Sequence, residues 1–171
     1  MKKYLTDKGI NGDRIRILQC FDYLTKDEIK EERKNSNIVV SVATVGRSPF
    51  LGKISYADLG IHINLYGKRG EDYDTILGKD ITHKGTFRSD NVSALEGSWG
   101  LVWDGDSVDT CNTAMGEYLR YNSPHKISLF IAAHIPIIIW DQAAKAEYVK
   151  EKGLGICVSL LRVNIPRSGY H

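Results

Sequence analysis

Short apolar runs alternate along this chain with segments of helical pattern. Residues 38–43, IVVSVA, form a continuous β-branched run, which is typical of a strand buried on both faces. Further apolar runs predict strands at residues 61–66, 81–85, 100–103, 136–140 and 156–159. Helical patterns lie between them, at residues 51–59, 89–96, 124–133 and between Asp141 and Gly153. Strands that alternate with helices predict crossover connections. The predicted fold class is therefore α/β, a Rossmann-like doubly wound parallel sheet with helices on both faces.

The chain before residue 37 has a different character. Residues 1–9 form a weak helical pattern that ends at Gly9, and Ile15 and Ile17 alternate with polar residues as a short strand would. Charged residues dominate the stretch that follows, up to residue 36. We therefore divide the chain into a preceding segment with a linker (residues 1–36), one domain (residues 37–160) and a tail (residues 161–171).

Composition places this chain among globular proteins and excludes several other classes. Of its 171 residues 42% are hydrophobic and 26% are charged, as in an ordinary single domain. A formal net charge of +2 gives no argument for nucleic-acid binding. No apolar run approaches the roughly 18 residues of a membrane span, and the first residues lack the apolar core of a signal peptide. The three widely spaced cysteines predict reduced thiols, neither a disulfide framework nor a zinc site.

The start of the predicted helix at residues 124–133 is the strongest candidate site. Ser123 suits the N-cap of that helix, and Pro124 suits its first position, where a missing N–H costs nothing. Free backbone N–H groups and the positive end of the helix dipole would then face an anion such as a phosphate. The alternative is simply a well-capped helix. Lys126 favours the anion site, because a cation in the first turn opposes the dipole unless an anion lies between them.

Two further loops should meet this helix start, because ligands of such sheets bind outside the carboxyl ends of the strands. The first follows the strand at residues 38–43 and contains Arg47. It lacks a glycine-rich phosphate motif, so a plain loop is an equal alternative. The second contains Phe87, which could offer its face to a base. From composition alone, a core aromatic at a strand end is favoured there.

Three aspartates, Asp104, Asp106 and Asp109, raise the question of a divalent metal. Their spacing differs from that of a calcium-binding loop, and no histidine lies near them in the sequence. Loop caps and turn formers are the better interpretation. We therefore expect no metal.

Several sequence blocks resemble one known family. They are GLVWDGDS at residues 100–107 and GEYLRYNSPHKISLFIAAHIPIIIWDQAA at 116–144, with SVATVGRSPFL at 41–51, HKGTF at 83–87 and FDYL at 21–24. These blocks are similar to the C-terminal half of bacterial sugar transferases, the galactofuranosyltransferase and glucosyltransferase enzymes of the GT-B class. The resemblance covers about residues 14–165, and YNSPHK is its most specific part.

The resemblance implies two Rossmann-like domains with the active site between them, of which this chain supplies one half of the GT-B fold. In such enzymes the C-terminal domain holds the nucleotide of a UDP-sugar, while the N-terminal domain holds the glycan acceptor and supplies catalytic groups. The catalytic residues are therefore expected outside this domain, and neither a metal nor a cofactor besides the donor is expected. The positions implied to contact UDP are Arg47, Ser48, Phe87, Tyr121, Asn122, Ser123, His125 and Lys126.

The chain also departs from the family pattern. A complete member should be about twice as long, and residues 1–24 look like the last helix and strand of the missing N-terminal domain. His134 occupies a turn where relatives often have glycine. We therefore expect a domain that binds UDP and has little transferase activity alone, although the full-length protein would transfer a hexosyl or galactofuranosyl group to a glycan or glycoprotein.

Other functions and settings stay open at this stage. The chain could be a non-catalytic partner domain that assembles with a separate glycosyltransferase chain, and a homo-oligomer is a further open partner. A flavodoxin-like or response-regulator domain would need an acidic pocket after the first strand, and residues 43–46 supply none. We expect a cytoplasmic location, with the inner face of the membrane as an alternative.

Overall fold

The computed structural model describes residues 2–26, 37–53, 60–71, 73–78 and 80–161 of the chain. In this part of the chain a single six-stranded sheet forms, with the strand order β3-β2-β1-β4-β5-β6. Each neighbouring pair of strands is parallel. The strands are β1 (Ile38–Thr44), β2 (Ile63–Lys68), β3 (Ile81–Gly85), β4 (Trp99–Val102), β5 (Ile137–Trp140) and β6 (Gly155–Val158). The predicted doubly wound α/β fold is thus confirmed.

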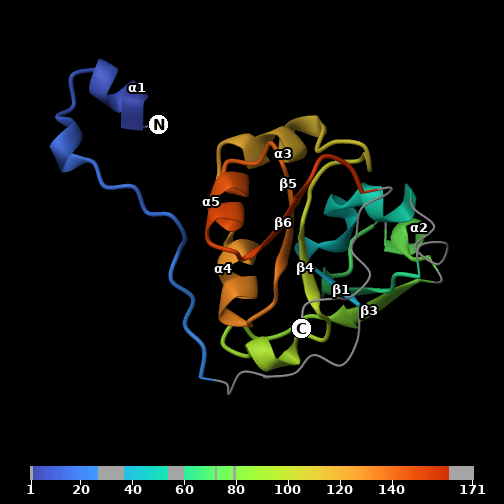
Figure 1. The fold of residues 1–171 in the computed structure, drawn as a ribbon. Helices are drawn as coiled ribbons and strands as arrows, with labels where there is room; N and C mark the ends of the chain where they lie inside the picture. The colour runs from blue at the N-terminus through green and yellow to red at the C-terminus, as the bar shows by residue number, and fades with distance from the viewer. Residues whose placement is uncertain (1, 27–36, 54–59, 72, 79, 162–171) are drawn as a thin grey trace.

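Helices cover both faces of this sheet. Figure 1 shows α4 (His125–Ala132) and α5 (Ala146–Glu151) on one side, and α2 (Tyr73–Ile76) with the 3-10 turns that follow β1 on the other. The remaining helices of the described part of the chain are α1 (Lys2–Asp7) and α3 (Thr113–Glu117), and its 3-10 turns are η1 (Gly12–Arg14), η2 (Val45–Arg47), η3 (Pro49–Lys53), η5 (Val92–Ala94) and η6 (Tyr118–Arg120). In the described residues no helix combines the length and the apolar character needed to cross a membrane.

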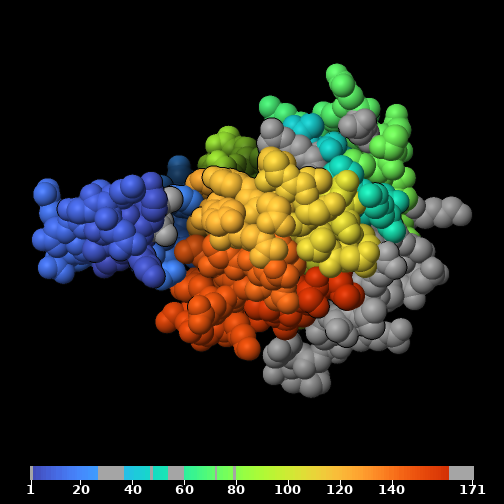
Figure 2. Space-filling view, turned by 90° about the horizontal axis from the view of Figure 1, so that it is seen from above, coloured from blue at the N-terminus to red at the C-terminus, as the bar shows by residue number. Residues whose placement is uncertain are grey.

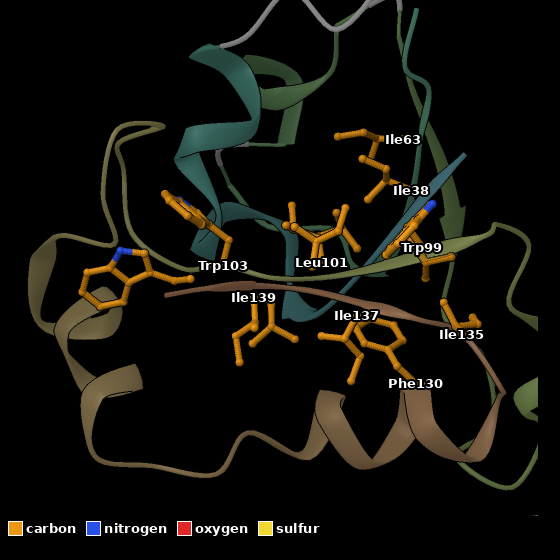
Figure 3. Close-up of a cluster of buried hydrophobic side chains, with 14 of the residues drawn as sticks. Ile38, Ile63, Trp99, Leu101, Trp103, Phe130, Ile135, Ile137 and Ile139 are labelled. Atoms are coloured by element: carbon orange, nitrogen blue, oxygen red, sulfur yellow. The ribbon is translucent and has the colours of Figure 1, made fainter. Parts of the chain in front are cut away.

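The core lies where α4 packs against the central strands. Every residue of β5 is fully buried, as its uninterrupted apolar sequence predicts. Figure 3 shows Phe130 of α4 beside Ile137, with Leu101 of β4 on the opposite side of the sheet. Gly100 makes room for this contact, because a Cβ at that position would lie only 2.5 Å from two ring carbons of Phe130. A glycine in β4 thus lets the helix approach the sheet closely.

The two ends of α4 differ in how well the sequence predicted them. The helix begins at His125, and Pro124 is the N-cap residue with an extended backbone (ψ 136°), so the predictions of Ser123 as N-cap and Pro124 as first helical residue are wrong. At the other end His134 is left-handed (φ 51°), and the N–H of Ile135 donates to the carbonyl of Phe130 at 2.8 Å. This is the kind of helix end that glycine favours, so His134 adopts there a backbone conformation that is uncommon for a residue with a side chain.

Other local predictions also need correction. No strand forms at Ile15 or Ile17, since the only regular structure in residues 8–26 is η1. The helix predicted at 89–96 is the short turn η5, and its cap is Asn91, whose Oδ1 accepts from the N–H of Ala94 at 3.1 Å. Side chains such as Asn91 compete with helical hydrogen bonds and so favour turns.

Further differences concern the neighbours of α4. The sequence predicts a polar loop at residues 119–123, but the first two of these residues belong to η6, and Leu119 is buried. The helix predicted to follow Asp141 begins only at Ala146. The stretch predicted as a helix at 51–59 begins inside η3, and residues 54–59 lie outside the described residues. Most of the predicted charged linker (residues 27–36) and most of the tail (residues 162–171) also lie outside them.

The N-terminal segment is separate from the sheet domain. None of the residues of α1 is buried, and Figure 2 shows this region projecting from the body of the molecule. The side chains of Ile17 and Leu18, further along this segment, are also exposed. From residue 19 the chain turns onto the domain surface, as described below.

Candidate functional site

A cavity of about 420 Å³ lies at the carboxyl ends of the central strands. In the observed strand order the connections run in opposite directions from β1 and β4, which are neighbours. This switch point is where open α/β sheets bind their ligands. The residues that line the cavity come from the end of β1, the loops after β3 and β4, α3, the start of α4 and the N-terminal segment. They are Tyr23, Ser41, Val42, Ala43, Phe87, Ser89, Asp104, Met115, Pro124, His125, Lys126 and Leu129.

Among the described residues that line this cavity, Lys126 and Asp104 form a largely buried ion pair. Lys126 Nζ lies 3.0 Å from Asp104 Oδ1 and 3.1 Å from Oδ2, and 3.4 Å from the backbone oxygen of Trp103. The two side chains are 13% and 18% exposed. A cation in the first turn of α4 is therefore balanced by an aspartate that follows β4. The anion that the sequence analysis expected beside Lys126 was that of a ligand such as a phosphate, and this expectation stays a prediction, because the observed partner is a carboxylate of the chain itself.

Aromatic side chains form another part of the cavity. The ring of Phe87 contacts that of Tyr66 edge to face, with centroids 5.6 Å apart. Phe87 is half-buried against the core and also lines the cavity, so the two interpretations of this residue are compatible. Tyr23 lines the cavity as well, and burial, with a smaller effect of Asp90, raises the pKa of its phenol. These rings offer a surface on which a planar base could stack.

Tyr23 reaches the cavity because residues 19–25, which we call the strap, cross three parts of the domain. Ser123 Oγ donates to the backbone oxygen of Gln19 at 3.3 Å, and Lys145 Nζ donates to Gln19 Oε1 at 3.3 Å. At the far end Thr25 Oγ1 donates to the carbonyl of Asp90 at 3.1 Å. The strap thus connects the region before α5, the start of α4 and the loop after β3.

An aromatic contact holds the middle of the strap. The ring of Phe21 stacks on that of His125, with centroids 4.5 Å apart and planes 14° from parallel. His125 is the first residue of α4 and lines the cavity, so this contact lies at the cavity's rim. The strap is therefore part of the candidate site, although the sequence placed residues 1–36 outside the domain.

Only some of the predicted site residues line the cavity. Phe87, His125 and Lys126 line the cavity together. Tyr121 is 79% exposed and outside the cavity lining, and Ser123 contacts the strap. Their predicted contact with UDP stays a prediction.

The remaining predicted positions lie close to these elements. Arg47 ends η2 just after β1, but its side chain lies outside the described part of the structure. Ser48 follows it and is fully buried, and among the described residues its hydroxyl has no hydrogen-bond partner. The side-chain oxygen of Asn122, just before α4, is likewise buried without a partner in the described part of the chain. Neither Ser48 nor Asn122 is among the residues found to line the cavity, so their predicted contact with UDP also stays a prediction.

Two of the three aspartates, Asp104 and Asp106, have different roles. Asn112 Oδ1 accepts from the N–H groups of Asp106 and Ser107, both at 3.1 Å, and the Asn112 amide donates to the carboxylate of Asp106. The interpretation of Asp106 as a turn former is confirmed, whereas for Asp104 it is wrong because that carboxylate pairs with Lys126. Within the described residues, no group of three or more potential metal ligands lies together.

Two residues of the cavity escaped the sequence interpretation of the site. Asp104 carried a usable signal, since it directly follows a strand and would lie at the carboxyl edge of the sheet. The sequence signal for Tyr23 was weaker, because the position of this residue depends on contacts with residues far along the chain. Both contribute side chains of the kind that bind ligands.

An all-parallel sheet of this order defines a Rossmann-like α/β domain, and its cavity lies at the switch point where such sheets bind ligands. Residues 39–163 match the model of the family described as "Glucosyltransferase 3-like, C-terminal domain". The chain belongs to this family, which confirms the resemblance inferred from the sequence blocks.

Two curated relatives are glycosyltransferases by name. The chain is 34% identical over 166 residues to the beta-1,6-galactofuranosyltransferase WbbI of Escherichia coli (strain K12), a match that covers 95% of this chain and 48% of that protein. It is 36% identical over 66 residues to glucosyltransferase 3 of Streptococcus gordonii, covering 39% of this chain and 19% of that protein. The matches thus span about half of the first relative and less of the second.

Proposed function

We propose that this domain binds the UDP part of a UDP-sugar donor as one half of a GT-B glycosyltransferase. The full enzyme would transfer a hexosyl or galactofuranosyl group to a glycan or glycoprotein acceptor. The observation that carries the proposal is the cavity at the switch point, with Lys126 and the start of α4 in it, in a chain of a glucosyltransferase-like family. Its volume of about 420 Å³ lies in the range of small-molecule sites, roughly 300–1,000 Å³.

The base and the diphosphate of such a donor would each have a counterpart in the cavity. The base would stack on the aromatic surface of Phe87 and Tyr23. The diphosphate would lie at the start of α4, where the backbone N–H groups of the first turn and Lys126 can donate to its oxygens. Because negative charge grows on the diphosphate as the sugar leaves, these donors stabilise the transition state more than the bound donor. Groups that act on the acceptor would come from outside this domain.

Isothermal calorimetry with UDP tests this proposal. Lys126→Ala removes a charged donor, and hydrogen bonds to charged groups contribute about 1.5–3 kcal/mol, so UDP affinity should fall about tenfold to a hundredfold. The substitution also leaves the Asp104 carboxylate unbalanced, which disfavours an anion further. Asn122→Ala removes a buried acceptor at the same helix start and should weaken binding by a smaller factor.

Lys150→Ala is the matched control, since Lys150 is an exposed cation on α5 outside the cavity lining. It should leave UDP affinity unchanged. If Lys126→Ala and Asn122→Ala both bind UDP as the unmodified chain does, the assignment of the site is wrong. Absence of UDP binding by the unmodified chain would contradict the proposed function itself.

A further inference from the structure

The ion pair in the cavity is an unusual arrangement for a site that holds a diphosphate. Lys126 has three donor hydrogens, and three oxygens surround it: both carboxylate oxygens of Asp104 and the backbone oxygen of Trp103. A phosphate can therefore bind Lys126 only by sharing or replacing one of these contacts. The pair as a whole is neutral, and its carboxylate repels an approaching phosphate. If the cavity bound only a diphosphate, its affinity for that group would be higher without the carboxylate of Asp104.

The carboxylate of Asp104 has capacity left for a donor from the ligand. An ionised carboxylate offers about four lone-pair positions. Within the described residues, Lys126 is the sole hydrogen-bond partner of this carboxylate. Asp104 also lines the cavity, with its side chain 18% exposed, so a ligand can reach it. A ligand group that binds this carboxylate must donate a hydrogen to it. An ionised phosphate has no hydrogen to donate.

A sugar joined to the diphosphate carries such groups beside the phosphate. The hydroxyl on the carbon next to the anomeric carbon lies only a few bonds from the β-phosphate oxygen. One ligand can therefore place a phosphate oxygen on Lys126 and a hydroxyl on Asp104 at the same time. The short distance between the two side-chain groups suits this adjacent pair of an anion and a donor.

We propose that Asp104 is a specificity-determining residue whose carboxylate accepts a hydrogen bond from a hydroxyl of the transferred sugar and so favours the sugar-loaded nucleotide over UDP. The proposal rests on the function proposed above. It adds a selection between donor and product, because UDP lacks the sugar hydroxyl but keeps the phosphate that Asp104 repels. Asp104 thereby aids release of UDP after transfer.

The test compares affinities for UDP, UDP-glucose and UDP-galactofuranose, measured by calorimetry on the 171-residue chain and on Asp104→Asn. An amide does not repel phosphate and accepts more weakly, so UDP should bind equally well or better. The preference for at least one UDP-sugar over UDP should fall about tenfold, as expected for the loss of a hydrogen bond to a charged group. Asp109→Asn, in the same loop but outside the cavity lining, should keep the original preference.

Two results with the Asp104→Asn variant would overturn the proposal. If Asp104→Asn weakens UDP and both UDP-sugars by the same factor, the carboxylate only positions Lys126 or contacts the ribose. If it changes none of them, the carboxylate has no role in binding. By contrast, failure of the unmodified chain to bind any of the three ligands would contradict the proposed function rather than the role of Asp104.

A second variant covers the case in which Asp104→Asn does not fold, since it leaves the Lys126 ammonium without its partner. The double substitution Asp104→Asn with Lys126→Gln removes both charges and replaces the ion pair by two amides. Thermal unfolding establishes which variants are folded. The double variant should bind all three ligands weakly and should have lost the preference for the sugar. A preference equal to that of Lys126→Gln alone would overturn the proposal.

Discussion

The substitution Gly100→Ala tests how closely α4 must pack on β4 to build the candidate site. The added Cβ would lie 2.5 Å from Phe130 Cδ2 and Cγ and 2.7 Å from Cδ1. Ordinary contacts of this kind begin near 3.4 Å, so the ring is about 1 Å too close. Phe130 is fully buried and has no open space into which it can turn. Either the ring or the whole helix must therefore move.

The cost follows from this overlap. Inserting one carbon into a well-packed core typically destabilises a protein by about 1–3 kcal/mol. For a domain of this length, about 2 kcal/mol corresponds to a fall in Tm of roughly 4–8 °C. Because His125 and Lys126 lie on the same helix as Phe130, a shift of α4 should also lower the affinity for UDP.

Urea unfolding followed by tryptophan fluorescence measures the change in stability, and calorimetry measures UDP binding. Gly78→Ala is the control, because a Cβ at that exposed position meets nothing within 4 Å. It should be neutral or slightly stabilising. Phe130→Leu in the Gly100→Ala chain should remove the clash, so the double variant should lose less stability than the two single losses combined. Unchanged stability of Gly100→Ala, or full additivity with Phe130→Leu, would refute this description of the packing.

Two further predictions concern a buried thiol and the strap. Burial raises the pKa of the Cys111 thiol from 9.0 to about 12. Because this pKa is higher in the folded state, the protonated thiol contributes its full stabilisation of the fold below pH 9, and this contribution is lost as the pH rises toward 12. Urea unfolding between pH 8 and 11 should therefore show a smaller loss of stability with pH in Cys111→Ala, and an equal slope would contradict the assignment. Tyr23→Ala should weaken UDP binding about tenfold in calorimetry, as expected for loss of a base-stacking ring. Leu24→Ala, whose side chain is 86% exposed, should not change it, and equal effects of the two would argue against stacking on Tyr23.

The sheet could be predicted from sequence because its signal is local. The run from Ile38 onward is apolar and β-branched, which is typical of a central parallel strand. In β1 the residues 38–40 are buried, and the carboxyl end of the strand opens onto the cavity. Segments 89–96 and 15–20 were mispredicted for a related reason. Their patterns are short, and single polar side chains such as Asn91 decide between helix and turn.

The candidate site could be predicted only in part. Lys126 was identified because its position in the first helical turn has an electrostatic consequence that sequence alone reveals. The residue that balances the charge of Lys126 is Asp104. It belongs to another loop, so the pairing depends on how β4 and α4 pack together. The position of Tyr23 depends on still longer contacts, such as that between Gln19 and Lys145, which are 126 residues apart. No periodicity in the sequence encodes such a contact.

The strap also has a thermodynamic consequence. Since Tyr23 forms part of the cavity wall, docking of the strap and occupancy of the cavity are linked equilibria. If docking of the strap strengthens ligand binding by a certain free energy, then a bound ligand that touches Tyr23 stabilises the docked strap by the same free energy. Whatever pulls on the chain before Gln19 therefore acts on the affinity of the cavity, and filling the cavity restrains the chain before Gln19 in return.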